Sequence, residues 1–256
     1  MNTFRLSAAF LALSFVALAP AWADWNIGDP YKMHYPQLPD PNGWDVNSTY
    51  YIGVADDWLC TGSGPVTDIH AWFSWRGDQD ATPEFVHVQI WSDDRSGQFS
   101  KPGQPLWHKD FSAEDPNLKV RFWGQGDQGW YDPSTGSFVQ HDHQNIFQLN
   151  VLIDPTEAFV QEQGNIYWLE LSVKFPLGTP PNIQVGWKTS ISPQFEDDAV
   201  WREITMGAPN WREIREPITG KSLDMAFVIT PEPNTLVLLL GAGLMVLALR
   251  RLRTKG

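Results

Sequence analysis

The feature of this 256-residue chain that most constrains its fold is a series of short runs in which apolar and polar residues alternate. Residues 66–75, 84–91, 145–153 and 166–175 all follow this pattern. A period of two indicates a β-strand with one buried face. Segments rich in Gly and Pro separate the runs, and the one helical candidate is a turn around residues 156–163. The sequence therefore predicts an all-β fold, an antiparallel β-sandwich for which a jelly roll is one arrangement.

The composition agrees with this fold class, because 14 Trp and 14 Phe residues accompany 20 Gly and 20 Pro residues. Large flat side chains suit the wide packing faces of sheets. The sequence WREI occurs at residues 201–204 and again at 211–214, which predicts two adjacent short strands. Residues 24–47 are expected to form an irregular N-terminal arm, and residues 124–136 a loop or the tip of a hairpin. Further strands are expected at residues 49–54, 106–111, 119–123, 183–189 and 222–229.

The N-terminal segment has the pattern of a secretory signal peptide, residues 1–23. Arg5 supplies a positive charge, residues 6–19 are almost entirely apolar, and Ala21 and Ala23 form an A-x-A cleavage site. We expect signal peptidase to remove this segment. It is therefore excluded from the folded body.

The C-terminal segment, residues 231–256, combines three features in order. A Pro-Glu-Pro triplet comes first, an uncharged run at residues 235–249 follows, and a basic cluster ends the chain: Pro231, Glu232, Pro233, then Arg250, Arg251 and Arg253. As a helix the run would be roughly 22 Å long, short of the ~30 Å hydrocarbon core of a membrane. The basic residues are expected to stay on the cytoplasmic side. The sequence thus predicts one marginal transmembrane helix.

This three-part tail resembles the PEP-CTERM sorting signal of exported bacterial proteins. The resemblance implies export and transient insertion into the inner membrane, followed by cleavage near the Pro-Glu-Pro triplet by an exosortase. The protein then passes to the cell envelope or the extracellular polysaccharide matrix. The alternative is a C-terminal anchor that is never processed.

The body also carries a resemblance, to an uncharacterised domain of exported bacterial proteins, several of which have the same tail. The resemblance implies a fold unit and a location, and no activity. The similar segments are residues 55–60, 67–75, 90–94, 187–190, 195–201 and 222–229.

The charge balance restricts the partners of the body, residues 24–230. The whole chain has 30 Asp and Glu residues against 18 Lys and Arg residues, a net charge of −12, and the terminal segments hold several of the basic ones. This argues against nucleic acid, whose phosphates need a basic surface. It favours cations or neutral partners such as polysaccharide. Cys60 is the only cysteine, so neither an intramolecular disulfide nor a cysteine-based zinc site is possible.

Three acidic doublets are the candidate metal ligands. Carboxylates on loops between strands are the ligands that Ca²⁺ needs, although no EF-hand-like spacing is present. The alternative is that the doublets are solvated turns. The six residues are Asp56, Asp57, Asp93, Asp94, Asp197 and Asp198.

Trp72 and Trp91 are the candidate glycan-binding residues. Each lies on the polar face of its predicted strand, and an exposed indole there could stack on the apolar face of a sugar ring. The alternative is that the arm or a second layer covers both. His141 and His143 flank Asp142 and could hold a metal, but no third ligand is identifiable, and a surface loop is the simpler interpretation.

No catalytic motif is visible: G-x-S-x-G, H-E-x-x-H, phosphate-binding and dinucleotide-binding patterns are all missing from the sequence. We therefore expect a non-enzymatic exported protein of the envelope or matrix, without a cofactor apart from the candidate calcium. The first alternative is a carbohydrate-binding module that uses exposed tryptophans. The second is a glycan-acting hydrolase, which would need a carboxylate pair that the sequence does not single out.

Overall fold

The computed structural model describes residues 24–191, 193–205, 207 and 209–231. Within these residues the protein is all-β, and its one helical element is a 3-10 turn, Arg76–Asp78. The all-β prediction is confirmed, whereas the helical turn expected around residues 156–163 is wrong, because that segment holds turns and a short strand. The signal peptide, the run at residues 235–249 and the basic cluster lie outside the described residues. No helix in the described part is long and apolar enough to cross a membrane.

The first of two six-stranded sheets has the order β11-β1-β7-β8-β4-β14. Strand β11 also pairs with β4, so the five strands β11, β1, β7, β8 and β4 close into a barrel. The predicted antiparallel sandwich consists of two open sheets, so the barrel closure differs from the prediction. The parallel pairing of β1 with β7 differs from it as well. The strands are β1 (Trp44–Asn47), β4 (Asp68–Trp75), β7 (Leu118–Asp132), β8 (Ser137–Leu152), β11 (Val185–Lys188) and β14 (Phe227–Ile229).

The second sheet has the order β13-β12-β2-β10-β5-β6, and every pairing in it is antiparallel. The predicted adjacency of the two WREI segments is confirmed, because β12 pairs with β13. A small third sheet joins β3 (Gly64–Pro65) to β9 (Val160–Gln161). The strands of the second sheet are β2 (Ile52–Leu59), β5 (Phe85–Asp94), β6 (Lys101–Ser112), β10 (Ile166–Lys174), β12 (Val200–Glu203) and β13 (Arg212–Glu213).

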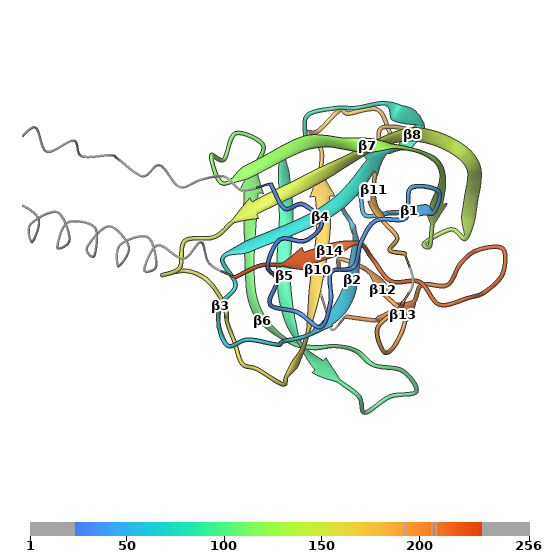
Figure 1. The fold of residues 1–256 in the computed structure, drawn as a ribbon. Coiled ribbons are helices and arrows are strands. Elements are labelled where there is room, and N and C mark those ends of the chain that lie inside the picture. The colour runs from blue at the N-terminus through green and yellow to red at the C-terminus, as the bar shows by residue number, and fades with distance from the viewer. Residues whose placement is uncertain (1–23, 192, 206, 208, 232–256) are drawn as a thin grey trace, which may run out of the picture.

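The main hydrophobic core lies between the barrel and the second sheet (Figure 1). Val88 and Leu169 of the second sheet belong to the same buried cluster as Ile69 and Val151 of the barrel. A smaller cluster covers the other face of the second sheet and contains Trp91, Trp168 and Trp211. Both faces of the second sheet are therefore partly buried, which explains the high tryptophan content.

The hairpin of β7 and β8 is longer than the sequence indicates. Of residues 124–136, expected to be a loop or hairpin tip, only residues 133–136 form the turn; residues 124–132 belong to β7 and pair with β8 through several register shifts. A hairpin of this length curves round so that β7 meets β1 (Figure 1). The barrel interior is narrow there: a Cβ on Gly186 would come within 2.8 Å of the Trp130 ring. Glycine at this position thus permits the closure.

The N-terminal arm is more ordered than expected and pairs with the end of the body. Its last residues form β1, and its middle runs alongside β14, where the Lys32 N–H donates to the Ile229 carbonyl at 2.7 Å. Asp24 accepts a hydrogen bond from Asn150 of β8, and Thr230 donates one to Asp68 of β4. Since β4 and β8 pair at these positions, both ends of the body lie at the same end of the barrel.

Candidate functional site

The predicted acidic doublets do not act as pairs; in β2 and β5 the reason is that alternation along a strand sends neighbouring side chains to opposite faces. Asp56 of β2 points into the main core. Its oxygens accept hydrogen bonds from the Gln37 side chain at 2.8 Å, the Met225 N–H at 2.6 Å and the Asp57 N–H at 2.9 Å. It therefore ties the arm and the C-terminal segment to β2.

Asp57 lies on the opposite face of β2 and is the most unusual group in the protein. Its side chain is fully buried, and neither carboxylate oxygen has a hydrogen-bond partner among the described residues. Burial raises its pKa well above the ordinary value, and the negative charges of Asp224 and Asp93 raise it further. A buried carboxylate without a partner is rare, since its charged form is strongly disfavoured.

Asp224 completes this buried acidic cluster, which we define as Asp56, Asp57, Asp198 and Asp224. One Asp224 oxygen accepts the Phe195 N–H at 2.6 Å, and the other has no partner in the described structure. Burial raises its pKa to about 7 against the opposing effect of the Phe195 hydrogen bond, and Asp198 contributes to the rise. Burial also raises the pKa of Asp56, so Asp56, Asp57 and Asp224 keep their protons at pH values where surface carboxylates have lost them.

The remaining doublet residues have separate roles at the edge of this cluster. Asp93 accepts the Trp168 indole N–H at 2.8 Å and pairs with Arg95 at 2.7 Å. Asp198 pairs with Arg215. Asp94 accepts the Ser96 N–H in a local turn, which fits the solvated-turn interpretation, whereas Asp197 accepts the N–H of Ser100, which is distant in the sequence. Sequence reasoning missed Asp224, although an acid inside the apolar run at residues 222–229 was a visible signal.

The cluster does not form a ready metal site. Across the part of the chain that the structure describes, no three His, Cys, Asp or Glu side chains are placed to hold a metal ion together. The unpartnered oxygens belong to Asp57 and Asp224, whereas Asp93 and Asp198 are engaged by arginines. Calcium binding at the doublets therefore stays a prediction.

The two candidate tryptophans lack the exposure that glycan binding would require. Trp72 is 0% exposed and packs edge-on against Trp25 of the arm, with ring centroids 6.0 Å apart. Trp91 is 4% exposed and lies in the other sheet. The two rings cannot form one platform for a sugar. The arm and the second hydrophobic cluster cover them, as in the alternative interpretation.

Trp91 belongs to a buried charged assembly on the outer face of the second sheet. The Arg202 guanidinium lies 5.1 Å from the Trp91 ring centroid and 5.2 Å from that of Trp211. It forms two hydrogen bonds with Glu170, at 2.8 and 3.1 Å, and the Trp91 indole N–H donates to the same carboxylate. A Cβ on Gly53 would collide with this carboxylate, at 2.0 Å. The charges of Arg202 and Glu170 therefore pair with each other inside the protein.

The barrel interior holds a second buried charge network. Asp45 accepts from Lys188 and from His143 at 2.9 Å each, and His143 also contacts Asp142 at 3.0 Å. Burial opposes a charged imidazole, but the bonds to the two carboxylates raise the His143 pKa to about 9. His141 is exposed and pairs with Asp127, so the two histidines do not share a site.

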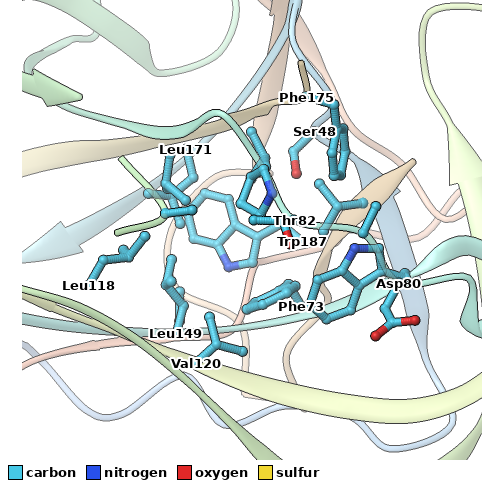
Figure 2. A pocket seen from close by; sticks show the side chains of 18 of the residues that line it. Ser48, Phe73, Asp80, Thr82, Leu118, Val120, Leu149, Leu171, Phe175 and Trp187 are labelled. Atoms are coloured by element: carbon cyan, nitrogen blue, oxygen red, sulfur yellow. The ribbon is translucent and has the colours of Figure 1, made fainter. Parts of the chain in front are cut away.

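An apolar cavity of about 510 Å³ lies between the barrel and the second sheet (Figure 2). Phe73, Leu149 and Trp187 line it from the barrel, and Leu171 lines it from the second sheet. Leu118, Leu149 and Leu171 gather at one end, and Asp80 and Phe175 lie at the other. Sequence reasoning did not find this cavity, because the lining residues have the same alternating pattern as an ordinary core.

Comparison with known families places both parts of the chain. Residues 33–230 match the family described as "Domain of unknown function (DUF7901)", and residues 230–253 match the "PEP-CTERM protein-sorting motif". Both resemblances inferred from the sequence are thereby confirmed. The motif implies an exported protein that an exosortase processes and that is directed to the cell envelope or surface. No curated protein and no solved structure matches the chain.

Proposed function

The chain belongs to the DUF7901 family and ends in a PEP-CTERM motif, and we propose on this basis that it is a non-enzymatic protein of the cell envelope or extracellular matrix, released there by exosortase cleavage. Signal peptidase removes residues 1–23, and the segment at residues 235–249 holds the chain in the inner membrane until the exosortase cuts.

The observation that carries the proposal is where the folded body ends. Strand β14 stops at Ile229, Thr230 still donates to the Asp68 carbonyl, and the Pro-Glu-Pro triplet begins at the next residue. Cleavage at the triplet would remove no residue of the core. The body would leave the membrane with every strand in place.

The use of the buried charges supports a role without catalysis. Glu170 is held by Arg202, Asp45 is held by Lys188 and His143, and all three partners are buried with them. A general acid or base must reach a substrate. Their hydrogen bonds and ring contacts among the described residues are all to neighbouring side chains within the fold, so these groups stabilise the fold.

Intact-mass spectrometry of the protein from exosortase-positive and exosortase-deficient hosts tests the proposal. We expect a chain that begins near residue 24 in both, and loss of the tail only in the first. Glu232→Gln should reduce cleavage, whereas Glu203→Gln on the body surface should not. Recovery of the hydrophobic segment on the protein in the exosortase-positive host would replace the proposal with a permanent anchor.

A further inference from the structure

The cavity between the two sheets is larger than ordinary packing leaves. Protein interiors contain few voids larger than a water molecule, whereas this one measures about 510 Å³. Ligand sites range from about 300 to 1,000 Å³ and are mostly apolar with a few polar groups. By size and lining this cavity belongs to that class.

The lining consists mainly of aromatic and branched side chains. Trp187 and Leu171 are buried on opposite walls, and Phe73 is half-buried beside Trp75, with ring centroids 5.0 Å apart. Val120, beside Leu149 in Figure 2, is 47% exposed, and Asp80 and Thr82 are exposed lining residues toward the other end, so the cavity opens to solvent. An apolar molecule could therefore enter and bury most of its surface.

Two of the lining residues, Trp72 and Trp75, have a buried indole N–H that is left without a partner among the described residues. Because an unsatisfied buried donor is uncommon and costly, a ligand whose acceptor oxygen reaches one of these N–H groups would supply the missing hydrogen bond. Asp80 is exposed at the mouth, and the chain as a whole is acidic, so an anionic ligand is disfavoured.

We propose that this cavity binds a neutral, mostly apolar small molecule with a hydrogen-bond acceptor, such as a fatty alcohol or an acyl ester. Scaling from a 150 Å³ cavity that holds benzene, the space suits roughly 20 non-hydrogen atoms. At the efficiency usual for ligands of that size, the dissociation constant is about 10–100 µM. The proposal does not depend on how the tail is processed.

Fluorescence titration of the secreted, detergent-free protein with N-phenylnaphthylamine, a neutral apolar probe, tests this site. We expect saturable binding of one probe per chain. Dodecanol and dodecanoate share a chain length and differ in charge. Because an anionic ligand is disfavoured, dodecanol should displace the probe at a lower concentration than dodecanoate. Asp80→Asn should narrow that difference.

Two variants and one control locate the binding. Leu149→Trp fills the cavity from the barrel side and should weaken probe binding at least tenfold, and Thr82→Trp at the exposed mouth should do the same without disturbing the core. Leu106→Trp adds an equal ring on exposed β6, away from the cavity, and should change nothing. Absence of saturable binding, or unchanged binding in Thr82→Trp, overturns the proposal. Equal displacement by dodecanoate overturns its restriction to neutral ligands.

Discussion

Replacing Asp224 with Asn should make the protein more stable at neutral and alkaline pH. The Asp224 carboxyl is buried, and one oxygen has no partner in the described structure. Asn keeps the size of the side chain, and its amide oxygen can still accept the Phe195 N–H. The substitution removes only the ability to ionise.

The size of the effect follows from the pKa. A rise from 3.8 in the unfolded chain to about 7 in the folded protein means that the folded state keeps a proton that the unfolded state has lost. Stability is then greatest below pH 4 and falls as the pH rises towards 7, by about 1.4 kcal/mol for each pH unit. The accumulated loss at pH 8 is about 4 kcal/mol, and Asp224→Asn should recover most of it.

Urea unfolding of both proteins between pH 4.5 and 8.5 measures this difference. Other groups also titrate, so the quantity of interest is the variant's free energy of unfolding minus the parent's, which should rise across the range. Asp94→Asn is the control. Hydrogen bonds from Ser96 hold the pKa of that surface carboxyl below its ordinary value, so the difference in free energy of unfolding for this variant should stay constant across the pH range. A difference that does not change with pH for Asp224→Asn would show that the carboxyl titrates normally and would refute the reasoning.

Three further predictions concern the C-terminal strand, the doublets and the charged assembly. A chain that stops at Gly220 should aggregate during refolding and one that stops at Thr230 should not, because the first exposes the edge of β4; equal light scattering would contradict this. Millimolar calcium should raise the melting temperature by several degrees at pH 8, and Asp57→Asn should abolish the shift. If calcium raises the melting temperature no more than magnesium does, the doublets have a structural role and do not bind calcium specifically. Arg202→Ala should cost about 3–5 kcal/mol in urea unfolding, because it strands the buried carboxylate of Glu170; a loss below about 1 kcal/mol would show that water replaces the arginine.

The strands were predictable wherever one face is buried and the other polar. Residues 84–91 and 166–175 became β5 and β10 with small shifts at their ends. The long hairpin was not predictable, because GQGDQG at residues 124–129 has the composition of a loop and is held in β7 only by pairing with β8 and β1. Barrel closure is likewise a long-range result that no local pattern contains.

The glycan-platform hypothesis for Trp72 and Trp91 does not fit the fold, for one physical reason. Alternation shows which residues share a face, but it does not show whether that face is covered. Trp72 and Trp91 do lie on the faces expected for them, and the arm and a second cluster bury both. The same holds for Asp57, which sequence reasoning placed at the surface and the fold places in a dry interior.

The pairing between the arm and β14 determines when this protein can finish folding. A chain exported from its N-terminus delivers the arm to the far side of the membrane first and β14 last. The hydrogen bonds from Lys32 to Ile229 and from Gln37 to Phe227 can therefore form only after nearly the whole body has crossed the membrane. On the export route proposed above, the body closes only as the Pro-Glu-Pro triplet reaches the membrane, so the completed fold and the cleavage site become available together.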